Sequence, residues 1–479
     1  MTFPHRISAS GLSVLASISL IAGATAATAA AGIVTSPDGP GTISASSATA
    51  PGVPPSLAEA DPTIADPASD PFYTPPTSIP STPGSLIRDQ FAPHLLAGFD
   101  REDAPARADK ILYTSTAQDG SPIATSGFVM EPARPWSGEG PTPTIVFGPG
   151  TRGAGDDCAP SRSGHLLFSA DNASDNVNLN YEYPFYAMAS AAGYRVVVTD
   201  YIGLGTPGQH TYVNHTEEGH AVLDAARAGL AFADAPADSP VAFFGYSQGG
   251  GAVAGAAELA SSYAPELNLK GVFAGAPPAN LEDVTDTVDG SMGGNVLGFA
   301  LNGALARNPE LTPLADKYFN DEGKAFLYET AAECTFTMDD DAPDLSDFDV
   351  TDPVGSFMFD SRRLTADGRS FGEIIQDDDD LRRILLGPDY RLGDRPVDVP
   401  MFILGAVNDD TIPYGQTKQL AEDYCASGTT VKFLTDDTPA VLTGTGLGHA
   451  VPQINHATEV FDWIGDRFNG VDAASTCGN

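Results

Sequence analysis

The chain has 479 residues, and its 63 acidic side chains against 24 Lys and Arg give a net charge of −39. A charge of this sign and size excludes nucleic acids and anionic membranes as electrostatic partners, because both would be repelled. Apolar residues make up 42% of the chain, enough for a sizeable core, so the length fits one large domain with an insertion or two domains.

The first 31 residues have the pattern of an export signal. A short polar start with Arg6 precedes the apolar run "GLSVLASISLIAG", and small residues with Ala-x-Ala-like cleavage options follow between about Ala24 and Ala31. The run is too short to span a bilayer. We therefore expect a secreted protein, extracellular or associated with the cell envelope.

Residues 32–85 are rich in Pro, Ser, Ala, Thr and Gly and predict a disordered leader, with order starting near "DPFYTPP". Residues 110–132 then predict two strands joined by a turn that contains Asp-Gly. From there, short apolar runs alternate with helix-like segments, which favours an α/β fold with a mostly parallel sheet flanked by helices. The runs are residues 143–148, 194–200, 240–245, 270–275, 399–405 and 430–436, and the helix-like segments are residues 181–192, 215–233, 249–263 and 456–468.

An interval of more than a hundred residues separates the fourth of these runs from the fifth and contains helical patches and acidic loops. A structureless loop of that length is implausible in a compact domain. We expect an inserted, mainly helical cap over residues 280–398, between core segments 86–279 and 399–479. The apolar patch at residues 295–306 could face a lipid interface or could pack the cap onto the core.

The stretch "FFGYSQGGG" places Gly-x-Ser-x-Gly directly after an apolar strand and directly before a helix-like segment. This is the context of a nucleophile elbow, a strained turn in which side chains at Gly245 and Gly249 would collide as the chain reverses. The following helix would direct its N–H groups at the site and favour negative charge there. We predict Ser247 as a nucleophile, with an ordinary glycine-rich turn as the alternative.

A serine nucleophile needs a histidine base, and the base needs an acid that orients it. In the α/β-hydrolase order, the acid and then the histidine follow the nucleophile elbow along the chain. Asp409 and Asp410 come directly after the strand-like run 399–405. We predict Asp409 as the acid, because the Asp-x-x-Ile-Pro arrangement turns the chain away after it, and Asp410 is the alternative. His449, in the glycine-rich loop "GTGLGHAVPQ", is the predicted base, whereas His456 would lie where the terminal helix begins, as a capping or surface residue.

Two main-chain N–H groups should form an oxyanion hole. We expect one from Gln248, the residue after the nucleophile, and one from Thr151 or Arg152 in the glycine-rich segment after residue 148. No Cys-x-x-Cys pair occurs, so we expect no metal site. An even number of cysteines in an exported chain predicts two disulfides, for which three pairings exist. The cysteines are Cys158, Cys334, Cys425 and Cys477.

Five ordered stretches resemble the secretory lipases of the lipase-A type across roughly residues 70–479: "GDDCAPS", "VVVTDYIGLGTPG", "EEGHAVLDAARA", "FFGYSQGGGAVAGAAELASSYAPELNLKG" and "VNDDTIPY". The resemblance implies an α/β-hydrolase core, a helical cap over an acyl-binding tunnel, and hydrolysis of carboxylic esters, including triacylglycerols, without a cofactor. It implies the triad Ser247, Asp409 and His449 and the disulfides Cys158–Cys334 and Cys425–Cys477.

We therefore predict a secreted lipase whose partner is a lipid or small ester substrate. Two other functions fit the same residues: transfer of the acyl group to an alcohol or sugar of the cell envelope, and a non-catalytic envelope protein that retains the fold. Gln248 follows the serine where some relatives have histidine, and the sequence leaves open what its carboxamide contacts.

Overall fold

The computed structural model describes residues 70–98, 107–170, 174, 176–236, 238–337, 358–440 and 442–478. The predicted export signal and the leader up to residue 69 lie outside the described residues. One compact unit begins at Pro71, and Phe72 and Tyr73 are buried in it. Order therefore starts at the predicted stretch "DPFYTPP", and residues 71–85, which their composition assigns to the leader, belong to the folded unit.

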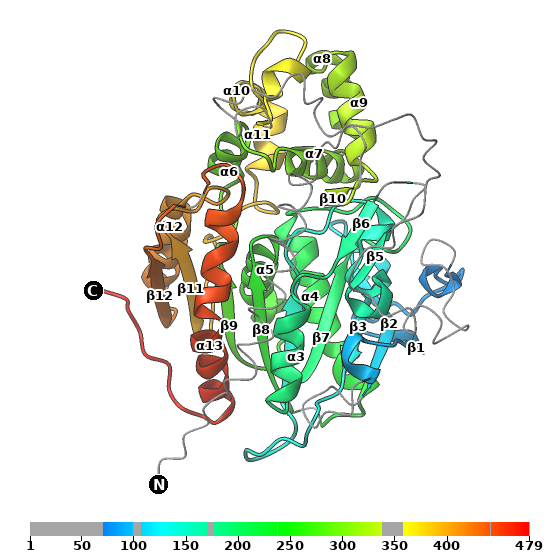
Figure 1. Ribbon diagram of the computed structural model, residues 1–479, viewed down its shortest axis with the longest axis vertical. Coiled ribbons are helices and arrows are strands. Elements are labelled where there is room, and N and C mark those ends of the chain that lie inside the picture. The colour runs from blue at the N-terminus through cyan, green and yellow to red at the C-terminus, as the bar shows by residue number, and fades with distance from the viewer. Residues whose placement is uncertain are drawn as a thin grey trace, which may run out of the picture. The chain divides into compact units, whose positions relative to one another are not determined.

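A nine-stranded sheet forms the centre of this unit, in the order β1-β2-β3-β7-β4-β8-β9-β11-β12 (Figure 1). The first four strands pair antiparallel, and the strands from β7 to β12 pair parallel. Each predicted run lies within two residues of a parallel strand. The strands are β1 Leu86–Phe91, β2 Ala108–Thr116, β3 Pro122–Met130, β4 Thr144–Gly148, β7 Arg195–Tyr201, β8 Pro240–Tyr246, β9 Asn268–Gly275, β11 Met401–Ala406 and β12 Val431–Asp436.

Helices cover both faces of the sheet. On one face, α4 and α5 pack against each other and share an apolar cluster with α12. On the other face lie α3 and α13, whose aromatic rings contact Phe244 of β8. The helices are α3 Tyr183–Ala191, α4 His215–Phe232, α5 Gln248–Tyr263, α12 Tyr414–Ala426 and α13 Leu447–Phe468. Among the described residues, none of the helices combines the length and the hydropathy that a membrane-spanning helix requires.

Two features differ from the sequence prediction. Helix α13 begins at Leu447 and not near residue 456, so His449 lies in its first turn and His456 lies inside it. The sequence reads as a loop here because of its glycines and Pro452, and a carboxylate from another element supplies the missing helix cap, as described below. A small sheet, β10-β6-β5, was also not predicted; its strands are β5 Phe168–Ala170, β6 Asn176–Leu179 and β10 Phe336–Thr337.

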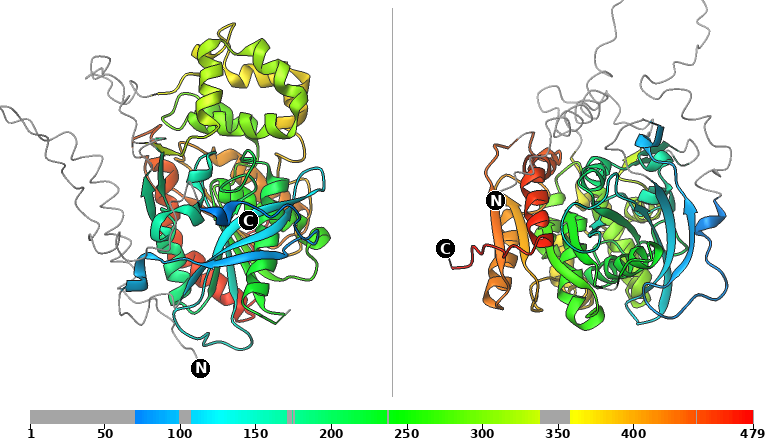
Figure 2. Two further views of the ribbon diagram at one scale, coloured as in Figure 1. Left: turned by 90° about the vertical axis from the view of Figure 1, so that its right-hand side faces the viewer. Right: turned by 90° about the horizontal axis from the view of Figure 1, so that it is seen from below.

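Between β9 and β11 the chain forms a group of helices, called the cap here, past the carboxyl ends of the parallel strands (Figures 1 and 2). Its helices line a small apolar cavity of about 40 Å³. In the apolar patch at residues 295–306, Leu297, Phe299 and Ala304 are buried, so they pack the cap. The helices are α6 Leu281–Val288, α7 Asn295–Arg307, α8 Thr312–Tyr318, α9 Asp321–Thr330, α10 Phe371–Asp377 and α11 Asp379–Leu385.

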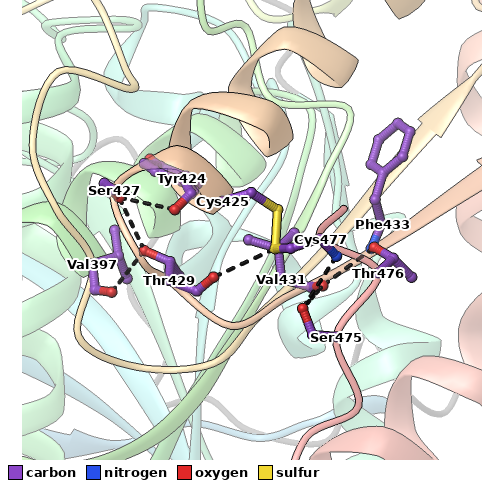
Figure 3. The surroundings of a disulfide bond; sticks show 10 residues. All are labelled: Val397, Tyr424, Cys425, Ser427, Thr429, Val431, Phe433, Ser475, Thr476 and Cys477. Carbon is purple, nitrogen blue, oxygen red and sulfur yellow. Dashed lines mark hydrogen bonds between the residues drawn. A yellow bond between two sulfur atoms is a disulfide. The ribbon is translucent and has the colours of Figure 1, made fainter. Parts of the chain in front are cut away.

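Two disulfides are present, in the pairing that the family resemblance implies. Cys158–Cys334 joins the segment after β4 to the end of the cap that leads into β10. Cys425–Cys477 joins α12 to the C-terminal segment, where Thr476 also donates a hydrogen bond to Val431 on β12 (Figure 3).

The cap is further linked to the core by an ion pair. Arg307, at the end of α7, donates two hydrogen bonds to the fully buried carboxylate of Glu217 on α4, at 2.7 and 3.0 Å.

Candidate active site

Ser247 lies at the junction of β8 and α5 with a φ of 59°, a backbone conformation that side-chain-bearing residues rarely adopt. Its N–H donates to the carbonyl of Gly275 at 2.9 Å. A Cβ at Gly245 would lie 2.0 Å from the Gly249 carbonyl oxygen, and a Cβ at Gly249 would lie 1.9 Å from that of Gly148. Because these contacts involve backbone, which cannot rotate away, only glycine fits at both positions.

The main-chain N–H of Gln248 is the first of helix α5 and has no acceptor in the described part of the chain. Such an N–H at a helix start favours negative charge beside it. The side chain points away from the site: it is 2% exposed, and its Nε2 lies 2.9 Å from His210 Nε2 and 2.7 Å from Glu218 Oε1. The Gln248 carboxamide is therefore part of the core and does not line a substrate site.

The hydrogen bonds of His210 fix its tautomer. Its Nδ1 lies 3.1 Å from the Ile202 carbonyl, which can only accept, so Nδ1 carries the proton and Nε2 accepts from Gln248. Burial lowers the pKa of His210, which keeps this ring neutral. Gln248 thus donates both of its side-chain amide hydrogens, and these bonds to His210 and Glu218 hold the first turn of α5 against the core.

The segment after β4 lies against the elbow, where Gly148 contacts Gly249. Its anchor is Glu182, a buried carboxylate that accepts from the Gly150 N–H at 3.0 Å and from the Arg152 guanidinium at 2.8 Å. Burial raises the pKa of Glu182, and the Arg152 charge opposes this rise. Within the described residues, the main-chain N–H groups of Thr151 and Arg152 have no acceptor, so each remains a candidate for the second oxyanion donor.

Asp409 and His449 form a hydrogen-bonded pair. The Asp409 carboxylate, with 1% of its side chain exposed, lies with Oδ2 at 2.8 Å and Oδ1 at 3.0 Å from His449 Nδ1. It also accepts the N–H groups of Thr411 and Ile412, so its own turn orients it. Because a carboxylate only accepts, Nδ1 of neutral His449 carries the proton and Nε2 carries the lone pair.

Asp410, the alternative acid, contacts the backbone around His449 and not its ring. Its carboxylate accepts the N–H groups of Gly444 at 2.9 Å, Gly446 at 3.0 Å and His449 at 3.1 Å. The two neighbouring aspartates therefore have different partners: Asp409 contacts the His449 imidazole, and Asp410 contacts the backbone at the start of α13.

Tyr246, the residue before Ser247, joins the elbow to this helix. Its hydroxyl donates to the His449 carbonyl at 2.6 Å, and the two rings lie 5.2 Å apart. No sequence pattern marks Tyr246, because the second position of Gly-x-Ser-x-Gly accepts any residue. Ser247, Asp409 and His449 thus gather at the carboxyl edge of the sheet, where ligands of open α/β sheets bind.

The electrostatics of His449 favour its charged form. Burial lowers the pKa of His449, but the nearby Asp409 carboxylate, with a smaller effect from Asp410, outweighs burial and raises it above its ordinary value. Its Nε2 atom is buried and has no hydrogen-bond partner in the described part of the chain, so no Ser247–His449 hydrogen bond is formed in this structure. Contacts of this kind often tighten only when substrate binds.

The model of the secretory lipase family matches residues 170–476. Among curated relatives, Lipase A of Arthroderma benhamiae is 26% identical over 86% of this chain and 81% of its own length. Secreted triacylglycerol lipase LIP1 of Malassezia furfur is 26% identical over 85% of this chain and 77% of its own length. A Mycobacterium tuberculosis relative, 27% identical over 77% of each chain, is named a probable inactive lipase, MT1628.

Solved structures share the fold. Candida antarctica lipase A in its closed state superposes with a TM-score of 0.67 and 22% identity, covering 87% of this chain and 89% of that one. The rice cell wall degrading esterase LipA of Xanthomonas oryzae, as a mutant, gives 0.61 and 18%, covering 81% of this chain and 100% of that one. These similarities show an α/β-hydrolase fold.

Proposed function

Since this chain belongs to the secretory lipase family and is a lipase or esterase, we propose that it is a secreted triacylglycerol lipase that forms an acyl-enzyme on Ser247. The observation that carries the proposal is the 2.8 Å contact between Asp409 and His449 Nδ1, which leaves the Nε2 lone pair free beside the nucleophile elbow. That tautomer is the one a general base needs.

In the proposed reaction, Ser247 Oγ attacks the ester carbonyl while His449 Nε2 takes its proton. The imidazolium then donates this proton to the alcohol leaving group, and water repeats the sequence to release the fatty acid. Asp409 fixes the tautomer and stabilises the imidazolium. For the first step, the Ser247 hydroxyl and Nε2 must approach within hydrogen-bonding distance, a contact that substrate binding would complete.

The negative charge of the tetrahedral intermediate would be stabilised by the N–H of Gln248 and by that of Thr151 or Arg152. Donors of this kind contribute about 3–4 kcal/mol each in comparable sites. The cap cavity is lined by aliphatic and aromatic side chains, the kind of surface that an acyl chain contacts, although no residue of the proposed triad lines it. Secretion accords with the names of several relatives and with the two disulfides.

The decisive experiment compares hydrolysis of p-nitrophenyl butyrate and of emulsified triolein by the wild type and Ser247→Ala. We expect the variant to lose both activities, with Ser261→Ala, an exposed serine at the far end of α5, unchanged. Ester hydrolysis by Ser247→Ala at the wild-type rate would refute the proposal.

Because one relative is named a probable inactive lipase, the acyl-enzyme on Ser247 needs a direct test. A fluorophosphonate should label the wild type at Ser247, and absence of labelling would contradict the proposed nucleophilic role of this serine. Product analysis with an added alcohol acceptor would distinguish hydrolysis from acyl transfer, since a transferase yields the new ester in place of the free fatty acid.

A further inference from the structure

Asp410 occupies an unusual position for a helix-capping residue, because it is far in sequence from the helix that it caps. Helix α13 starts after Gly446, which has a φ of 78° and no side chain that could cap the helix. Helix starts leave N–H groups without acceptors, and these groups normally bond a side chain. The carboxylate of Asp410 fills this role for the N–H groups of Gly446 and His449.

The same carboxylate also fixes the approach to the helix. It accepts the N–H of Gly444, two residues before Gly446, so one buried side chain holds three amides of the segment 444–449. A Cβ at Gly448 would lie 2.5 Å from the Asn408 carbonyl oxygen, so this segment packs directly on the backbone next to Asp410.

His449 is held at both ends of its own backbone. Asp410 accepts its N–H at 3.1 Å, and the Tyr246 hydroxyl donates to its carbonyl at 2.6 Å. The ring is then directed at Asp409, the immediate neighbour of Asp410. The distance between the base and its acid is therefore set by two adjacent residues of one turn after β11.

We propose that Asp410 is a positioning residue for the reaction at Ser247: it caps α13 so that His449 meets Asp409, and it adds a second negative charge near the imidazole. The proposal rests on the proposed function, in which His449 is the base. Asp409 and Asp410 are the titratable groups that shift the protonation of His449, and burial opposes both.

Two substitutions separate the two effects. Asp410→Ala removes both the cap and the charge, and we expect kcat to fall about 10- to 100-fold with KM little changed, because misplacement of a catalytic group by about 1 Å has effects of this size. Asp410→Asn keeps one capping oxygen and removes the charge, so we expect a smaller loss of kcat. In both variants the acid limb of the kcat/KM profile should move to lower pH.

Two controls exclude indirect causes. Asp437→Asn removes one negative charge from an exposed position in the segment before α13 and should leave kcat and the profile unchanged. Tyr246→Phe removes the bond to the His449 carbonyl without changing a charge, and we expect a lower kcat with an unshifted profile.

A second measurement does not require turnover. The His449 ring can be titrated by NMR in a Ser247→Ala background with and without Asp410→Asn, and we expect titration at lower pH without the carboxylate. Unchanged titration of His449 in the variant, or wild-type kcat and pH profile in Asp410→Ala, would overturn this proposal. Activity retained by Ser247→Ala alone would instead overturn the proposed function, and the role of Asp410 with it.

Discussion

The core and the cap hold their side chains by different means. Around His449 in the core, the contacts are directional hydrogen bonds between 2.6 and 3.1 Å: His449 donates to Asp409 and Asp410 and accepts from the Tyr246 hydroxyl. The cap cavity is instead lined by aliphatic and aromatic side chains, of which Leu301 and Phe371 are examples. Proton transfer requires fixed distances, which hydrogen bonds supply, whereas an acyl chain requires only apolar volume.

This difference predicts that changes in the core alter the rate for every ester, whereas changes in the cap alter selectivity or stability. The largest effect should come from Asp409→Asn, which leaves His449 Nδ1 without its acceptor and permits the wrong tautomer. By analogy with other serine triads, kcat should fall about 10⁴-fold. The loss should be equal for p-nitrophenyl butyrate and palmitate, and a loss confined to one chain length would break the comparison.

The contact between the two regions should matter mainly for stability. Arg307→Ala leaves the buried Glu217 carboxylate without its cation, and we expect a loss of about 2–4 kcal/mol in the free energy of unfolding in urea. Arg383→Ala, which breaks an exposed ion pair with Asp380 in the same cap, should change it by less than about 1 kcal/mol. Equal effects of the two substitutions would contradict a specific anchor at Glu217.

Filling the cavity should change selectivity and leave the chemistry intact. Leu301→Trp would occupy space in the cap cavity, so kcat/KM for palmitate relative to butyrate esters should fall about tenfold, as expected for lost apolar contacts of a few methylenes. Tyr328→Trp, at an 84% exposed position of α9, is the matched control. An equal loss of kcat/KM for the palmitate and butyrate esters would show that the cavity does not bind the acyl chain.

The smallest expected effect concerns the pH at which activity is lost on the acid side. Since neutral His449 is the proposed base and its pKa is raised, kcat/KM should be full at high pH and fall as pH drops through a value above about 6.5. The acid limb should be the same for short and long esters, because the two carboxylates that raise the pKa of His449, Asp409 and Asp410, both lie outside the cap. An acid limb in the wild type below the ordinary pKa of histidine would contradict the raised pKa.

The sheet could be predicted from sequence because parallel strands buried on both faces are continuous apolar runs. Strand β1, "LIRDQF", is half exposed at the sheet edge and carries two charges, so no such run marks it. The first turns of α13 were missed for a related reason: the helix start depends on Asp410, which lies in the turn after β11, far away in the sequence. Local patterns carry no information about a cap supplied from elsewhere.

The candidate site shows the same limit. The order of Ser247, Asp409 and His449 could be read from motifs, because the elbow and the strand ends fix where each residue lies. The contacts of Gln248 could not, since His210 and Glu218 reach it from the segment between β7 and α4 and from α4 itself. The adjacent pair Asp409 and Asp410 was the available sequence signal that a second aspartate has a role at the site. The geometry then shows that Asp409 contacts the imidazole ring of His449 and that Asp410 contacts its backbone.

The positive φ of Ser247 has an evolutionary consequence. A residue with a side chain in such a conformation stores about 1–3 kcal/mol of strain, which glycine would relieve and alanine would not. The Ser247→Gly protein should therefore be inactive and yet more resistant to heat than the Ser247→Ala protein. In a lineage released from selection for ester hydrolysis, replacement of this serine by glycine would thus be favoured over replacement by other residues, because only glycine relieves the strain.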